Sequence, residues 1–437
     1  MAKFLAILTM VIITSCYFFP FEFTFLPGIN TKMAMAGGGL ILLISRLAME
    51  REAKINDDFF RLSIWALVVS MAGLLSVVYN NTHDYTYVTY ILSMLVWSSG
   101  AYVTVWLIRK VHGVASVYLV CNYLAAVSVM QCLLALLIDK SPSFELFVNR
   151  WVAGLGFVDL NTLEEAGRLY GVGASLDVAG SRFAVVLVMI TYWMLRMART
   201  RRWKILLVYF AAFMFIAIVG NMIARTTTVG LVLSLIYVLY DSKIYMFQLS
   251  RESKRILSIS AVALTISLPI LVYEYNNDKQ FNSNLRFAFE GFFSLAEKGT
   301  WEVHSNDILK KMYVFPDNAR TWIIGDGYIE NPYYNDPYYV GPKWGGYYMA
   351  TDVGYLRFIF YFGLIGLSVF CYFMFLAGKI SMNRFKRESF LFVLLLVIHF
   401  TVWMKVSTDI FLVFALFLMI DQEENDEYEK LYLEEDL

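Results

Sequence analysis

Long apolar runs separated by short polar connections make up most of the chain. A run of about 20 apolar residues is long enough to cross a bilayer as a helix. Such runs occur near residues 4–20, 33–48, 60–79, 87–108, 114–138, 174–195, 203–223, 226–246, 256–273, 353–377, 389–404 and 406–420. The last two are short, but the polar stretch 404–409 favours two helices over one tilted helix. The pattern predicts an all-α polytopic membrane protein with about 12 transmembrane helices.

One segment is too polar for this pattern. Residues 275–352 form a stretch of 78 residues with 18 aromatic side chains, between the ninth and tenth predicted spans. The sequence then divides into nine spans within 1–273 (with an outer loop at 139–173), a large extracytoplasmic loop at 274–352, three spans within 353–420, and an acidic tail at 421–437. Because nearly everything else is membrane, we expect the large loop to carry the chemistry.

The composition agrees with a membrane protein. Of 437 residues, 59% are hydrophobic and 16% are charged, and the mean hydropathy is +0.58. A soluble domain cannot bury so many apolar side chains. The net charge of zero gives no support for nucleic-acid binding. All four cysteines fall inside apolar spans without a CxxC pair, so we interpret them as small buried hydrophobes rather than as a disulfide or a metal site.

Basic residues alternate between dense and sparse connections. Those at 46–61, 109–110, 196–204, 243–255 and 379–387 hold two to five lysines and arginines each, and the connections between them are nearly bare. The positive-inside rule places the dense connections and both termini in the cytoplasm. The outer loop at 139–173 and the large loop then lie on the other side of the membrane.

The C-terminal tail is strongly acidic. It carries nine acidic residues among its last 17. One interpretation is docking of a partner. We favour a solvated, disordered end, because a charged segment with few apolar residues buries little surface.

Several arginines lie where a membrane protein rarely places them. An arginine at membrane depth costs about 2.5–3.5 kcal/mol, so each one on the predicted outer side needs a reason. Arg182 lies in the sixth predicted span, Arg225 in a tight outer turn, and Arg357 one turn into the tenth span. Together with Arg168 and Arg320 in the outer loops, they are candidates to ring one extracytoplasmic cavity.

The chemistry of arginine suggests the ligand of such a cavity. A guanidinium holds phosphate or carboxylate through two parallel charged hydrogen bonds, and near a membrane the expected anion is a lipid-linked phosphate or pyrophosphate. The alternative is that these arginines reach lipid headgroups or pair with nearby aspartates. Asp177 lies five residues before Arg182, and Asp352 lies five residues before Arg357.

The aromatic side chains of the large loop indicate a second kind of ligand. Eight of them lie between Tyr328 and Tyr348, and flat aromatic faces pack well against sugar rings. The alternative is an interfacial belt or a small core of the loop itself. The turn Gly325-Asp326-Gly327 predicts an ordered loop. No sequence motif of a metalloprotease, a nucleotide-driven pump or a serine hydrolase is present.

Four segments resemble the O-antigen polymerase and ligase superfamily of bacterial membrane proteins. They are Arg168-Leu169-Tyr170-Gly171, Ala224-Arg225-Thr226-Thr227-Thr228-Val229-Gly230, Trp322-Ile323-Ile324-Gly325-Asp326-Gly327, and Asp352-Val353-Gly354-Tyr355-Leu356 with Gly363-Leu364-Ile365-Gly366. The likeness covers roughly residues 165–375 and the layout of many spans with one large late loop. Ligases of the family usually carry a histidine just before the closing span, whereas Thr351-Asp352 stand there in this chain, which favours a polymerase.

The resemblance implies an activity and a location. The chain would be a membrane glycosyltransferase that polymerises polyprenyl-pyrophosphate-linked oligosaccharide repeat units into O-antigen, capsular or exopolysaccharide. It would act at the outer face of the bacterial cytoplasmic (inner) membrane, without a metal or another cofactor. The implied partners are the lipid-linked oligosaccharide and the lipid bilayer, with a chain-length regulator and a flippase of the same pathway as further candidates.

The resemblance also implies roles for charged residues. Arg225 and Arg320 would stabilise negative charge on the departing pyrophosphate. Asp352 would accept the proton of the attacking hydroxyl, with Asp326 and Glu330 as alternative bases. A helix N-cap is the alternative role for Asp352. The candidates for substrate binding are Arg168, Asp177, Arg182, Asp326 and Arg357.

Three other functions remain open from the sequence. A ligase would transfer a finished glycan to a final acceptor. A lipid-glycan flippase or transporter also has many spans, but transporters tend to have repeated halves, and no repeat is visible here. A non-catalytic assembly factor for an envelope complex is the third.

Overall fold

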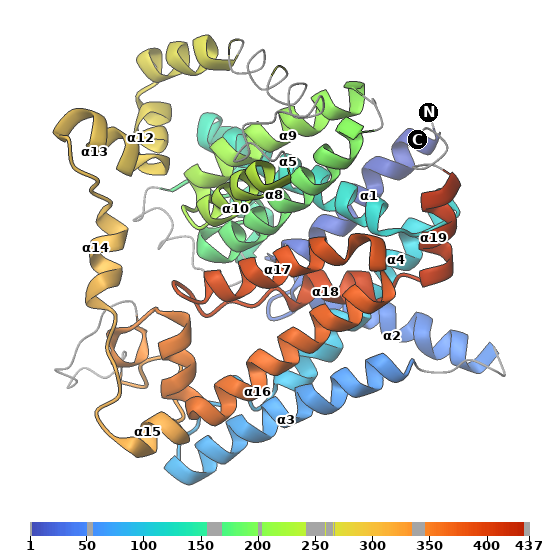
Figure 1. The fold of residues 1–437 in the computed structure, drawn as a ribbon, viewed down its shortest axis with the longest axis vertical. Coiled ribbons are helices and arrows are strands. Elements are labelled where there is room, and N and C mark those ends of the chain that lie inside the picture. Colours follow the sequence, from blue (N-terminus) through green and yellow to red (C-terminus); the bar gives the residue numbers. More distant parts are fainter. Residues whose placement is uncertain are drawn as a thin grey trace. The chain divides into compact units, whose positions relative to one another are not determined.

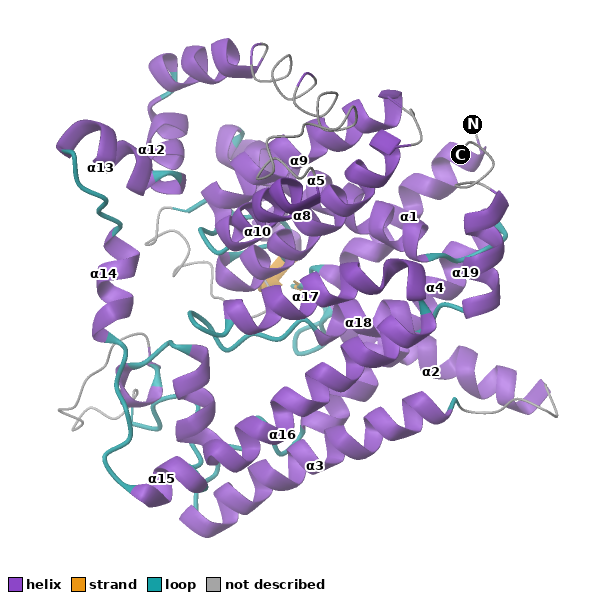
Figure 2. Cartoon of the chain, viewed as in Figure 1, coloured by secondary structure: helices purple, strands orange, loops and turns teal. Residues whose placement is uncertain are grey.

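The computed structural model describes residues 2–49, 56–154, 168–199, 203–241, 258, 265, 267–333 and 346–431, and these are overwhelmingly helical (Figures 1 and 2). The longer helices are α1 (Ala2–Phe18), α2 (Thr31–Met49), α3 (Asp57–Asn80), α4 (Tyr90–His112), α5 (Val117–Lys140), α8 (Leu176–Arg199), α9 (Trp203–Ile223), α10 (Thr227–Asp241), α16 (Gly354–Arg384) and α17 (Ser389–Val402). The shorter ones are α6 (Pro142–Trp151), α12 (Lys279–Ala288), α13 (Glu290–Lys298), α14 (His304–Lys311), α15 (Ala319–Ile323), α18 (Phe411–Leu418), α19 (Gln422–Glu429), and the 3-10 turns η3 (Tyr348–Ala350) and η4 (Lys386–Glu388). Two short antiparallel strands, β1 (Glu22–Phe23) and β2 (Val152–Gly154), form the one sheet of the described part.

Seven of the described helices are long and apolar enough to cross a membrane, judged by length and composition. They are α2, α3, α4, α5, α8, α9 and α16. The protein is therefore an all-α, membrane-embedded chain. Shorter helices occupy the predicted spans at 4–20, 226–246, 389–404 and 406–420, and most of 256–273 lies outside the described residues. The total of twelve spans stays a prediction.

The described helices pack into two compact units. The first comprises residues 1–41, 99–297 and 419–437, and the second comprises 42–98 and 298–418. The first part of the large loop therefore packs with the helices before it, and the rest packs with the helices after it. This division follows packing, whereas the one drawn from the sequence follows the expected membrane topology.

Helix α8 is the centre of the first unit. Nearly all of its residues are buried, and it packs against α5, α9 and α10. Small residues permit a close approach of the helices, because a Cβ at Gly230 of α10 would lie 2.3 Å from the backbone of Ala184 in α8. Small residues at such contacts are typical of helices that associate in membranes. By contrast, α2 exposes apolar residues such as Ile41 and Ile44, as a lipid-facing helix does.

The second unit is built on α3 and α16, which run side by side (Figure 1). Helix α16 is kinked at Phe362 and Gly363, where the backbone leaves helical geometry. An aromatic core surrounds the kink, with contacting rings from the start of α4 and the turn before it, from α16, and from the residue that follows α17. Its members are Tyr87, Tyr90, Phe358, Phe362, Phe370 and Trp403.

The acidic C-terminal segment forms a docked helix in the first unit. The expectation of a disordered end is wrong for residues 422–431, since Asn425 and Glu429 of α19 are fully buried. Arg109 at the end of α4 makes a 2.8 Å ion pair with Glu424, and Arg196 in the last turn of α8 makes a 3.1 Å ion pair with Glu429. The helix is held by charges on its neighbours rather than by an apolar stripe, which composition does not reveal.

This docking predicts a stability effect. Glu429→Ala removes a fully buried carboxylate and leaves Arg196 without that charge, so we expect a loss of about 2–3 kcal/mol, somewhat below the usual cost of breaking a buried pair because Arg196 is partly exposed. Thermal unfolding in detergent measures it. Glu423→Ala on the exposed side of the same helix is the matched control and should change little. Equal unfolding temperatures for the two variants would contradict the docking.

Candidate functional site

Arg225 lies in a turn that is hydrogen-bonded to α8. Helix α9 ends at Ile223 and α10 begins at Thr227, which leaves only three residues for the turn. The Thr226 hydroxyl donates to a carboxylate oxygen of Asp177 in the first turn of α8. Gly180 makes room for this contact, because a Cβ there would lie 2.8 Å from the Ala224 side chain. Asp177, predicted to bind substrate, therefore anchors the turn that presents Arg225.

The Arg225 guanidinium meets the first helices of the large loop. Its Nε donates to the carbonyl of Phe287 at 3.0 Å, and its Nη2 makes a 2.7 Å ion pair with Oε2 of Glu290. The guanidinium carbon lies 4.0 Å from the centre of the Phe287 ring. Arg168 approaches the same ring at 5.0 Å. Two arginines 57 positions apart in sequence thus contact the same aromatic ring.

The electrostatics of this group follow from its burial. Burial lowers the pKa of the Arg225 guanidinium, and the positive charge of Arg168 lowers it further, while Glu290 and Asp177 act in the opposite direction. The side chain of Arg225 is 15% exposed and that of Glu290 is 33% exposed. Two cations held close together in a partly desolvated place bind anions more strongly than exposed arginines do. We call Arg168, Arg225, Phe287 and Glu290 the arginine seat.

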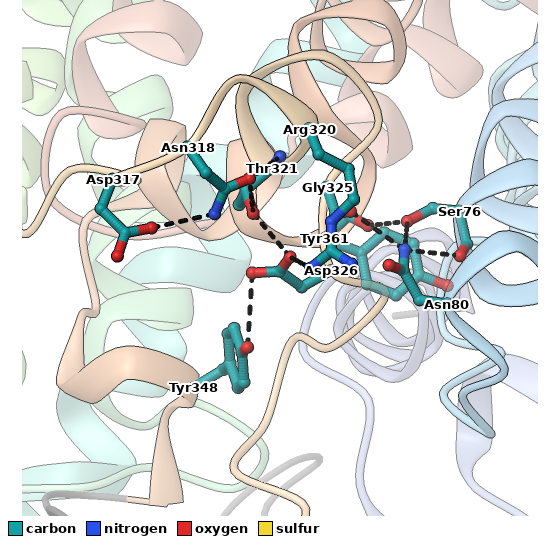
Figure 3. A network of polar contacts seen from close by, with 10 residues as sticks. All are labelled: Ser76, Asn80, Asp317, Asn318, Arg320, Thr321, Gly325, Asp326, Tyr348 and Tyr361. Atoms are coloured by element: carbon teal, nitrogen blue, oxygen red, sulfur yellow. Dashed lines mark hydrogen bonds and ion pairs between the residues drawn. The ribbon is translucent and has the colours of Figure 1, made fainter.

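The turn Gly325-Asp326-Gly327 lies on the kink of α16 in the second unit. The N–H groups of Asp326 and Gly327 donate to the carbonyls of Phe360 and Tyr361, at 2.6 and 3.0 Å. Figure 3 shows Ser76 and Asn80 of α3 joining this junction, since the Ser76 hydroxyl donates to the Tyr361 carbonyl at 2.6 Å. The motif that resembled a family segment is thus the point where the large loop is bonded to two long helices.

Asp326 collects polar side chains around this turn (Figure 3). The Thr321 hydroxyl lies 2.7 Å from one carboxylate oxygen, and the Tyr348 hydroxyl lies 3.3 Å from the other. Arg320 pairs with Asp326 at 3.4 Å, and its side chain is 55% exposed. Burial raises the pKa of the Tyr348 hydroxyl, and the Asp326 charge adds to this, so the hydroxyl remains a donor. Asp326 therefore holds several side chains of the loop together, whereas the Arg320 side chain extends into solvent.

Arg357 organises a second carboxylate group in the same unit. Its guanidinium is almost fully buried and forms two ion pairs, one with Glu330 and one with Asp352, the latter at 3.3 Å. The guanidinium carbon also lies 4.6 Å from the centre of the Tyr347 ring. Burial raises the pKa of the Glu330 carboxyl, against the lowering effect of Arg357. The N-cap of α16 is Val353, without a side-chain capping bond. The pairing of Arg357 with Asp352, which the sequence left open as the alternative, is present in the structure, and Asp352 does not cap α16.

An apolar groove of about 780 Å³ lies beside this group within the second unit. It extends along α16 and α17, with Val353 and Leu356 near one end and Met382 near the other. Tyr313 and Phe315 of the loop also line it. Its walls are almost wholly apolar, which suits a hydrocarbon chain better than a sugar.

The structure places the predicted residues in distinct groups. Arg168, Arg225 and Asp177 come together in the first unit. Arg320 with Asp326 and Arg357 with Asp352 form two groups in the second. That arginines of both units line one cavity stays a prediction. Within the described residues no cluster of three or more metal-ligating side chains occurs.

Arg182 has a structural environment. It is buried in α8, donates to the carbonyl of Phe18 and lies 5.6 Å from the Phe19 ring centre. Helix α1 ends at Phe18, so the Phe18 carbonyl has no N–H partner within the helix and needs a donor from another segment. Its role as a substrate-binding residue stays a prediction.

Phe287 and Glu290 are the members of the arginine seat that sequence reasoning missed. Phe287 is one of 18 aromatic residues in the loop, and no spacing links it to Arg225, which lies 62 positions earlier. Glu290 begins a short helix, where an acidic residue is common for reasons of the helix dipole alone. Neither position carried a sequence signal that could have separated it from its neighbours.

With this geometry established, the chain was compared with protein families, with curated proteins and with solved structures. None of the three comparisons finds a match. The likeness to the O-antigen polymerase and ligase superfamily therefore rests on the quoted segments, and assignment of an activity remains a proposal.

Proposed function

We propose that this protein is a membrane glycosyltransferase that polymerises polyprenyl-pyrophosphate-linked oligosaccharide repeats at the outer face of the cytoplasmic membrane. The observation that carries the proposal is the arginine seat, where Arg168 and Arg225 stack on one ring beside membrane helices. A partly desolvated pair of guanidiniums is suited to a pyrophosphate, which offers several anionic oxygens to planar donors.

The reaction would be a substitution at an anomeric carbon. A hydroxyl oxygen of one lipid-linked repeat forms a bond to the anomeric carbon of another glycan, and the bond from that carbon to the pyrophosphate oxygen breaks. Polyprenyl pyrophosphate leaves with the electron pair. Arg225 and Arg168 would stabilise this negative charge. Arg320 remains a candidate for the same role from the sequence. The bond to pyrophosphate supplies the driving force, so no nucleotide is required.

The groove on the second unit supports a lipid-linked substrate. It is apolar, lies along helix α16, which is long enough to cross a bilayer, and begins at Val353 next to Asp352. A polyprenyl chain would gain hydrophobic contacts there without leaving the membrane. The carboxylate of Asp326 and the rings of Tyr328 and Tyr348, in the same unit, are groups that hydrogen-bond and stack on sugars.

Asp352 is the proposed base for the acceptor hydroxyl. Arg357 keeps its ion pair with Glu330 when Asp352 loses its charge, so the change should affect chemistry more than folding. We expect Asp352→Asn to slow chain extension by about 100-fold or more. The exposed Asp317→Asn in the same loop is the matched control and should extend chains normally. Normal glycan ladders from Asp352→Asn would remove it from the mechanism.

The activity can be tested with purified protein in proteoliposomes that contain a lipid-linked oligosaccharide. A polymerase yields a ladder of lipid-linked products of increasing length. A ligase yields single transfers to a final acceptor, and a flippase moves the substrate across the bilayer without changing its length. An unchanged oligosaccharide on the outer face would contradict the proposal.

A further inference from the structure

The carboxylate of Glu290 stands where an anionic ligand of the arginine seat would bind. Its oxygen lies 2.7 Å from Nη2 of Arg225, the distance expected for a phosphate oxygen at the same nitrogen. The pairing arises within one corner of the loop, because Phe287 lies near the end of α12 and Glu290 begins α13 directly after Phe289. The connection between α12 and α13 therefore supplies both the Phe287 ring that the guanidiniums contact and the Glu290 carboxylate that pairs with Arg225.

The two ends of this ion pair differ in their access to solvent. The turn that carries Arg225 is held in place by Thr226, whose hydroxyl donates to the Asp177 carboxylate. Glu290 is the more exposed partner, on a helix of only nine residues. A competing anion would therefore replace the carboxylate and leave the guanidinium in place.

We propose that Glu290 is a built-in competitor of the substrate, which occupies the arginine seat until a multiply charged phosphate displaces it. This inference rests on the proposed function, since it concerns the same seat. A carboxylate carries one negative charge, whereas pyrophosphate carries at least two and reaches both guanidiniums, so the seat selects pyrophosphate over singly charged anions. The carboxylate also pairs with the positive charge of Arg225 when no substrate is bound.

The test is equilibrium binding of inorganic pyrophosphate to the full-length protein in detergent, measured by calorimetry. Glu290→Gln keeps the size of the side chain and removes its charge, so pyrophosphate should bind about five- to tenfold more tightly. Glu297→Gln is the matched control, because Glu297 lies on the same helix and pairs instead with Arg286 at 2.7 Å. It should bind pyrophosphate as the unmodified protein does. Arg225→Gln should lose at least tenfold in affinity.

The outcomes separate this inference from the proposed function. If Glu290→Gln binds no more tightly than the unmodified protein while Arg225→Gln binds more weakly, the competitor role is wrong and the seat stands. If Arg225→Gln binds as well as the unmodified protein, the seat itself is wrong and both proposals fall. Should Glu290→Gln not yield folded protein, Glu290→Asp shortens the reach of the carboxylate and should give a smaller gain in affinity, whereas an unchanged affinity would overturn the inference.

Discussion

Arg225→Ala should reduce glycan chain extension by about 100- to 1,000-fold, the loss typical of removing one preorganised donor from a developing negative charge. The variant removes the guanidinium that joins Phe287 and Glu290 to the α9–α10 turn. The turn itself should persist, because the contact of Thr226 with Asp177 does not involve Arg225. The measurement is the rate of ladder formation in proteoliposomes, beside the elution profile of the purified variant.

Two further variants sharpen this expectation. Arg225→Lys retains the charge but loses the planar donor pair, so it should recover only a small part of the rate. Arg286→Ala removes an arginine of the same loop that pairs with Glu297 and is 40% exposed, and it should leave the rate unchanged. Full-length ladders from a folded Arg225→Ala protein would rule out the arginine seat as the centre of the reaction.

Gly325→Ala should strongly destabilise the second unit. Gly325 has a φ of +85°, and a Cβ there would lie 2.5 Å from the backbone of Tyr361. The left-handed conformation alone costs a side chain about 1–2 kcal/mol, and the backbone overlap must also force the loop off the kink of α16. We expect a total loss of at least about 3 kcal/mol, seen as a lower unfolding temperature and a lower yield in detergent.

Gly299 provides the matched control for this substitution. Its φ is +74°, it belongs to the same unit, and no atom lies within 4 Å of the Cβ that alanine would add. Gly299→Ala should therefore show the conformational cost of about 1–2 kcal/mol without the overlap. Similar unfolding temperatures for the two variants would mean that the contact between the loop and α16 contributes little.

The membrane helices were predictable because a span leaves a simple trace in sequence, a run of about 20 apolar residues. The same rule could not find α12 to α15, which have five to ten residues each and carry no long periodic pattern. Nor could it find α19, whose buried faces are polar and whose partners, Arg109 and Arg196, lie far away in sequence. Such contacts are set by tertiary packing.

The candidate site shows the same limit. Arg225 and Arg357 were conspicuous because a cation is costly in a membrane, and Asp326 because glycines flank it. Their partners were not, apart from Asp352. The pairing of Arg357 with Glu330, and of Arg225 with Glu290, joins segments whose approach depends on how the loop folds.

The junction between the loop and α16 replaces hydrogen bonds that the kink removes from the helix. In a straight helix the carbonyls of Phe360 and Tyr361 would accept from the N–H groups of Leu364 and Ile365. At the kink, Asp326 and Gly327 supply donors instead, so both carbonyls stay hydrogen-bonded. Helix α16 therefore bends at Phe362 and Gly363 without leaving the Phe360 or Tyr361 carbonyl unpaired, and the bent geometry depends on the loop residues that supply these donors.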